Sequence, residues 1–145
     1  MTIFTEKWKK EILKKPKLRT YCKIKENYSI ERFVSLNLSS RERSILSQLH
    51  TGTLPLEIEI GRFRHISVEN RKCKICKTEI EDELHLIFHC TGYKEERESF
   101  FRTVDVKQEN SDIDKLKCLL KIHTRIFAKY VLKIMEIRNS KLLEE

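Results

Sequence analysis

The chain contains few of the residues that interrupt regular structure, with only three glycines, two prolines and one tryptophan among its 145 residues. Collagen-like chains and glycine- or proline-rich disordered chains are therefore excluded. Lysine or arginine interrupts every apolar stretch well before the roughly 20 consecutive apolar residues that a membrane helix needs. Residues 1–10 also lack the apolar centre of a signal peptide. We expect a soluble intracellular protein, nuclear or cytoplasmic, with no membrane partner.

Composition favours a folded, helical chain. Hydrophobic residues make up 39% and charged residues 36% of the sequence, a balance typical of a globular rather than a disordered chain. A chain of this length forms one domain or two small lobes and buries a modest core, so a bound metal ion would add useful stability.

Three of the five cysteines stand with a histidine at the spacing C-x2-C-x8-H-x4-C, formed by Cys73, Cys76, His85 and Cys90. Zinc binds thiolate and imidazole ligands tetrahedrally, and a two-residue gap lets one tight turn direct two sulfurs at the same ion. Because four protein ligands leave no position for water or substrate, we expect a structural zinc ion and no zinc catalysis.

Other interpretations of this cluster are weaker. Disulfides suit secreted chains with paired cysteines, and a redox C-x-x-C needs a helix N-terminus after a strand, which the residues around Cys76 do not suggest. Spacing allows two histidines as the third ligand, since His85 and His89 would share one helical face, whereas His85 and Cys90 are five residues apart. We favour His85 and keep His89 as the alternative; His65 is not at ligand spacing.

The net charge of +8 is distributed unevenly. Residues 1–78 hold 18 Lys and Arg against 8 Asp and Glu, a balance of +10, whereas residues 79–145 hold 12 against 14, a balance of −2. A basic region attracts phosphate through counterion release, so RNA or DNA is the expected partner. The alternative is that the lysine-rich helices are simply solvated.

Apolar periodicity predicts a series of helices. Residues 54–61 instead alternate apolar and acidic side chains, so we expect an extended segment or short strand there, with a helix as the alternative. The last two helices should pack antiparallel against each other. The expected helices cover residues 3–14, a stretch from Lys17 onward, 30–36, a helix capped by Ser39 and Glu42 and stopped by Gly52, a helix with an acidic start at 79–83 that continues through Phe88, 93–104, a helix capped by Ser111, and a final helix with an apolar stripe from Ile126 to Ile137.

These features predict a mainly α protein, a small helical domain built around a structural Cys-Cys-His-Cys (CCHC) zinc finger, with a C-terminal helical hairpin. The chain divides into a basic helical region at 1–52, the zinc-finger region at 53–104 and the hairpin at 105–145. The polar link at 105–110 is the clearest boundary.

The stretch from Lys17 to Arg97 resembles the C-terminal region of non-LTR (LINE-type) retrotransposon reverse transcriptases, downstream of the polymerase. The Cys-Cys-His-Cys cluster, with Glu-Asp-Glu before its histidine, is the specific part of the resemblance. The segments that carry it are Lys17–Tyr21, His50–Leu56, Glu57–Arg62, Val68–Cys76 and Glu81–Cys90, followed by Tyr93 and Arg97.

The resemblance implies that the histidine five residues before the last cysteine, His85, is the zinc ligand. It also implies a region that holds template RNA or target DNA. The sequence has no Tyr-x-Asp-Asp polymerase motif and no visible set of endonuclease carboxylates, so no catalytic residue is carried over and we expect a protein that is not an enzyme.

The leading hypothesis is thus a nonenzymatic, zinc-dependent nucleic-acid-binding domain, in which Tyr21 and Phe63 are possible stacking partners. The alternative is a zinc-stabilised protein–protein interaction module whose C-terminal helices bind the rest of a reverse transcriptase or another protein. Exposure of Ile126, Tyr130 and Ile134 would favour that alternative. The candidate phosphate contacts are Lys9, Lys10, Lys14, Lys15, Lys17, Arg19, Arg41, Arg43, Arg62, Arg64, Arg71, Lys72 and Lys74.

Overall fold

A computed structural model of the chain describes residues 3–15, 18–25 and 31–144, and these residues form helices and no strand apart from one isolated bridge between Lys72 and Ile80. The predicted mainly α fold is confirmed. The helices are α1 (Ile3–Leu13), α2 (Arg19–Ile24), α3 (Arg32–Ser35), α4 (Ser40–Thr51), α5 (Glu57–Phe63), η2 (Val68–Asn70), η3 (His85–His89), η4 (Thr91–Tyr93), α6 (Lys94–Thr103), α7 (Asp112–Lys121) and α8 (Thr124–Leu143).

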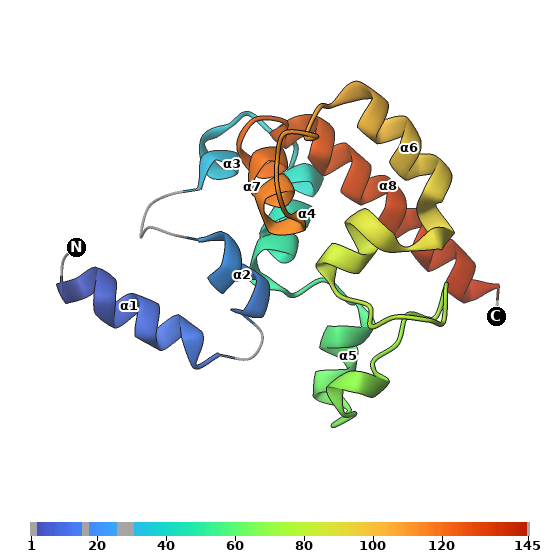
Figure 1. Cartoon of the computed structure of the whole chain (residues 1–145), viewed down its shortest axis with the longest axis horizontal. Helices are drawn as coiled ribbons and strands as arrows, with labels where there is room; N and C mark the ends of the chain where they lie inside the picture. Colours follow the sequence, from blue (N-terminus) through green and yellow to red (C-terminus); the bar gives the residue numbers. More distant parts are fainter. Residues whose placement is uncertain (1–2, 16–17, 26–30, 145) are drawn as a thin grey trace.

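The long helix α8 contacts three of the other helices. It packs against α4, α6 and α7; in Figure 1, α1 and α2 lie at the left of the molecule and α5 lies at the bottom of the view. Side chains from all three predicted regions, such as Ile24, Leu86 and Val131, belong to one buried cluster. The boundaries between the regions stay a prediction. No helix among the described residues combines the length and apolar character needed to cross a membrane.

Local signals set the ends of α4 and the start of α7. The Ser39 hydroxyl accepts a hydrogen bond from the backbone N–H of Glu42, and the Glu42 carboxylate accepts one from the backbone N–H of Ser39, so the predicted capping box is present. Gly52 ends the helix in the left-handed region at φ 73°. The Ser111 hydroxyl caps α7 through the N–H of Asp114.

Most of the apolar stripe predicted for α8 is buried. Phe127, Val131 and Ile134 are completely buried and Tyr130 is nearly so, whereas Ile126 is 47% exposed. Ile126, at the start of the stripe, lies outside the buried face, so the prediction for this residue is wrong.

Residues 54–61 do not form the extended segment or short strand that the alternation favoured; the helix kept as the alternative is present from Glu57, where α5 begins. The alternation was misleading because its acidic positions are buried too: Glu57 and Glu59 are 7% and 5% exposed. The Glu59 carboxylate accepts hydrogen bonds from Arg62 one turn later. Leu54, Leu56 and Ile58 do enter the core, as their apolar character predicts.

The helix expected to begin at 79–83 begins later. Residues 71–81 instead form a short antiparallel arm, in which the Cys73 N–H donates to the Glu79 carbonyl and the Glu81 N–H donates to the Arg71 carbonyl. Asp82 then caps the helix, because its carboxylate accepts a hydrogen bond from the N–H of His85 at 2.8 Å. Only the last two acidic residues of the run therefore lie at the helix start.

A buried ion pair joins this arm to α8. The Arg138 guanidinium donates to both carboxylate oxygens of Glu81, with Nε–Oε2 2.9 Å and Nη2–Oε1 2.7 Å, and neither residue is more than 2% exposed. The same Glu81 carboxylate accepts a hydrogen bond from the N–H of Glu57 at 2.8 Å, and the Glu81 carbonyl accepts one from Ile58. Glu81 thus fixes the start of α5 against both the arm and α8.

We predict that Arg138→Leu lowers the free energy of unfolding by roughly 3–5 kcal/mol, because it leaves the Glu81 carboxylate buried without its cation. Arg41→Leu is the matched control, since Arg41 pairs with Glu136 at 2.8 Å on the exposed surface, where an ion pair contributes about 0–1 kcal/mol. Urea denaturation followed by circular dichroism measures both. Equal losses in the two variants would contradict the role given to Glu81.

Candidate metal centre

The four predicted ligands meet at one point. Their donor atoms, the sulfurs of Cys73, Cys76 and Cys90 and a ring nitrogen of His85, all lie within 4.8 Å of one another. Cys73, His85 and Cys90 are buried and Cys76 is partly exposed. Within the part of the chain that the structure describes, this group can bind a metal ion.

A tight turn aims the first two sulfurs. The N–H of Ile75 donates to the Cys73 sulfur at 3.4 Å, and the N–H of Lys77 donates to the Cys73 carbonyl at 2.9 Å. Lys77 adopts the left-handed region at φ 63°, which reverses the chain after Cys76. The Thr78 hydroxyl donates to the Cys76 sulfur at 3.3 Å. These hydrogen bonds supply the geometry that a C-x2-C metal turn requires.

A π-helical turn brings His85 and Cys90 together. In η3 the N–H of Cys90 donates to the carbonyl of His85, five residues earlier, at 2.8 Å. This wider turn places residues five apart closer to the same side than an α-helix does. His89 points elsewhere, pairing with Asp112 at 2.5 Å and lying outside the cluster. The spacing argument that kept His89 as an alternative assumed an α-helix.

Hydrogen bonds and charge inside the cluster shift its pKa values. The hydrogen bond to Cys90, together with burial, raises the pKa of the Cys73 thiol to about 12, and the same bond lowers the pKa of Cys90. Burial lowers the pKa of His85, but its hydrogen bond and charge interactions with Cys73, aided by Cys76 and Glu79, outweigh burial and raise it to about 9. A positive charge next to these closely spaced sulfurs is therefore stabilised, and a bound metal cation would supply that charge.

Two carboxylates lie next to the ligands. Glu79 Oε2 lies 3.1 Å from Nδ1 of His85, on the side of the ring opposite the nitrogen that faces Cys76 at 3.4 Å. Such a carboxylate fixes the orientation of a metal-binding imidazole. Glu81 Oε2 lies 3.6 Å from the Cys73 sulfur while Arg138 balances its charge. Sequence reasoning missed both roles, because an acidic run does not reveal which member faces the histidine.

The predicted phosphate contacts divide into two groups. Arg19 pairs with buried Glu83 at 2.7 Å, Arg62 pairs with Glu59, and Arg71 donates to two backbone carbonyls, so these guanidinium groups already serve the fold. Lys17 lies outside the described residues, and Lys9 is half-buried. Three of the exposed candidates also have partners: Arg41 pairs with Glu136, Arg43 donates to the carbonyl of Leu38, and the Lys74 ammonium lies 3.5 Å from the Glu57 carboxylate. The exposed members are Lys10, Lys14, Lys15, Arg41, Arg43, Arg64, Lys72 and Lys74.

The two candidate stacking residues differ in the same way. Tyr21 is held between other rings, with centroids 6.1 Å from Trp8 and 4.9 Å from His50. Phe63 is 69% exposed, and the Arg62 guanidinium lies 4.4 Å above its ring. Phe63 is therefore the exposed ring of the two, with Arg62 over one of its faces.

Comparisons of the chain with protein-family models, with curated proteins and with solved structures found no match. Function is therefore inferred from the residues of the site.

We predict that His85→Asn abolishes tight binding of one Co²⁺ ion per chain, whereas His89→Asn leaves it unchanged. The reason is that only His85 places a ring nitrogen among the three sulfurs. Titration with Co²⁺, followed by the ligand-to-metal and d–d absorption of a tetrahedral thiolate site, measures both variants. Loss of binding in the His89 variant, or retention in the His85 variant, would show the ligand assignment to be wrong.

We also predict that Glu79→Gln weakens metal affinity by about 10- to 100-fold while the fold is retained, since it removes the carboxylate that orients His85. Glu95→Gln, an exposed change on α6, serves as control and should leave affinity unchanged. Competition with a chromophoric chelator gives the two dissociation constants. Indistinguishable constants would contradict the orienting role.

Proposed function

We propose that this protein is a nonenzymatic, zinc-dependent nucleic-acid-binding domain. The observation that carries the proposal is the convergence of three sulfurs and one imidazole nitrogen, with the exposed Lys72 and Lys74 on the arm that carries two of the sulfurs. Such a domain would hold RNA or DNA in an ordered position without chemical turnover. This role agrees with the resemblance to the C-terminal region of retrotransposon reverse transcriptases, in which template RNA or target DNA is held.

The donor set and its spacing support zinc as the metal. The Cys73 and Cys90 sulfurs are 3.8 Å apart, and the Cys76 sulfur lies 3.4 Å from Nε2 of His85. With Zn–S at about 2.3 Å and Zn–N at about 2.0–2.1 Å, tetrahedral geometry separates two sulfurs by about 3.8 Å and a sulfur from a nitrogen by about 3.5 Å. When bound, zinc supplies a cross-link among the four residues. Four ligands leave no open position, which supports a structural role.

The metal turn is connected to the exposed aromatic at the end of α5. Arg71, two residues before Cys73, donates from Nη1 to the carbonyl of Ile58 at 3.1 Å and from Nε to the carbonyl of Ile66 at 2.9 Å. Gly61 makes room for this side chain, because a Cβ there would lie 2.4 Å from the Arg71 Cγ. An ion that fixes the Cys73 turn would therefore also fix the loop that follows α5.

That loop has the chemistry of a nucleic-acid contact. Phe63 offers an open face for a base, and Arg64 is exposed beside it. Exposed Lys72 and Lys74 lie on the arm that Arg71 joins to this loop. Aromatic faces and nearby cations are the combination by which proteins bind single-stranded nucleic acid.

The alternative, a protein-interaction module that uses the C-terminal helices, receives less support. Its predicted contact residues include Tyr130 and Ile134, which are 5% and 0% exposed. Side chains buried within the chain's own core cannot serve as a docking face. Of the three named residues, only Ile126 is exposed.

We predict that the triple variant Arg64→Gln, Lys72→Gln, Lys74→Gln weakens binding to single-stranded RNA and DNA and flattens the dependence of affinity on salt. Each lost phosphate contact should reduce the slope of log K against log salt by about 0.7 for a single strand. The control removes three exposed cations of the acidic half, Arg102→Gln, Lys129→Gln and Lys133→Gln. Gel shifts at several salt concentrations, with single-stranded RNA, single-stranded DNA and duplex DNA and with and without chelator, measure the effect.

The expected result is loss of affinity in the first variant and on chelation, with the control close to the unmodified protein. No binding by the unmodified protein, or equal effects of the two triple variants, would overturn the proposal.

A further inference from the structure

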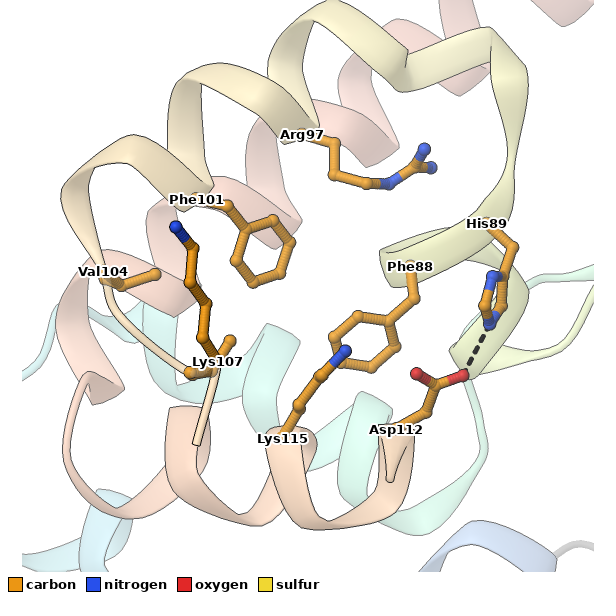
Figure 2. A pocket seen from close by; sticks show the side chains of 9 residues that line it. Phe88, His89, Arg97, Phe101, Val104, Lys107, Asp112 and Lys115 are labelled. Atoms are coloured by element: carbon orange, nitrogen blue, oxygen red, sulfur yellow. Dashed lines mark hydrogen bonds and ion pairs between the residues drawn. The ribbon is translucent and has the colours of Figure 1, made fainter. Parts of the chain in front are cut away.

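A cavity of about 300 Å³ lies between η3, α6 and the start of α7, apart from the metal cluster. Figure 2 shows the rings of Phe88 and Phe101 next to each other in the middle of the cavity, and Val104 also lines it, on the far side of Phe101. The two rings are stacked at an interplanar angle of 29° with centroids 6.0 Å apart. Both phenylalanines are partly exposed, so the cavity offers a flat, apolar surface to solvent.

The rim of the cavity is positively charged. Lys107 and Lys115 line it, and in Figure 2 their side chains extend beside the two rings. Among the described residues neither ammonium group has an ion-pair partner. Arg97 uses Nε and Nη2 on the carbonyls of Ile87 and Cys90. The one carboxylate of the rim, Asp112, is paired with His89 at 2.5 Å.

We propose that this cavity binds one nucleotide of a single-stranded nucleic acid, with the base against Phe88 and Phe101 and the adjoining phosphate at Lys107 and Lys115. The inference rests on the proposed function and assigns it a second contact, distinct from the loop at Phe63. A nucleotide carries both a flat apolar ring and an adjacent anion, and the cavity pairs a flat apolar floor with two uncompensated cations. An apolar protein side chain would match the floor but leave the two lysines unused.

Part of the cavity wall comes from the turn that carries two of the metal ligands. Phe88 and His89 lie between the ligands His85 and Cys90, on the π-helical turn that the ligands enclose. Arg97, on the cavity wall, donates to the carbonyl of Cys90 at 2.5 Å. The nucleotide site should therefore exist only in the metal-bound protein.

The first experiment tests the charge. We expect the double variant Lys107→Glu, Lys115→Glu to bind a single-stranded 12-mer about tenfold or more weakly than the unmodified protein. Lys107→Glu, Lys121→Glu is the matched control, because it makes the same charge change but replaces only one rim lysine, Lys121 being an exposed residue of α7 that does not line this cavity. The control variant should bind the 12-mer more tightly than the double variant, because it keeps Lys115 on the rim. Equal affinities of the two variants would overturn the nucleotide site.

The second experiment locates the base. Titration of the zinc-loaded protein with adenosine monophosphate, adenosine and inorganic phosphate should shift the methyl NMR signals of Val104 and Val106, which line the cavity, most strongly with the monophosphate. Unchanged valine signals while the 12-mer still binds would overturn the cavity site and leave the proposed function standing. No binding of the 12-mer to the unmodified protein would instead defeat the proposed function. Shifts caused by an acidic aromatic peptide but not by the nucleotide would assign the cavity to a protein partner.

Discussion

The buried pair of Glu81 and Arg138 is the interaction on which the arrangement of the other parts depends. Glu81 accepts hydrogen bonds from the start of α5 through its side chain and its carbonyl, lies in the arm that carries Cys73, and is held by α8 through Arg138. A carboxylate with no exposure would be very costly without its cation. The pair therefore fixes where α8 meets the arm, and so where the metal ligands stand relative to the helical core.

Ion pairs and hydrogen bonds within the fold also decide which basic side chains are available at the surface. The basic half of the chain suggests a broad phosphate-binding surface, yet Arg19 and Arg71 are occupied by Glu83 and by backbone carbonyls. Arginine suits such fixed roles because its planar group donates in several directions at once. The surface cations are mostly lysines, which keep their charge in solvent. Net charge therefore does not show which basic side chains are free to meet an anion; burial and pairing within the chain decide that.

Sequence patterns were sufficient where the determinants are local. Ser39, Glu42 and Gly52 set the ends of α4, and ligand spacing indicated the three cysteines of the metal centre and favoured His85 while leaving His89 as the alternative. Patterns were insufficient where distant residues decide. The strand prediction for 54–61 was wrong because Glu57 and Glu59 are buried, and the partner of Glu81 lies 57 residues away on α8. The π-helical turn that selects His85 over His89 has no sequence signature of its own.

The proposed zinc ion would act on both proposed contact surfaces through different routes. Through Arg71 it would fix the loop at Phe63, and through η3 it would fix Phe88 in the cavity. Structural zinc sites contribute about 10–16 kcal/mol of apparent binding energy, as much as the whole stability of many domains. The apolar contacts of α4 and α7 with α8 need no ion. Removing the metal should therefore loosen the two surfaces before the core, so nucleic-acid binding and zinc occupancy would be lost together while helices remain.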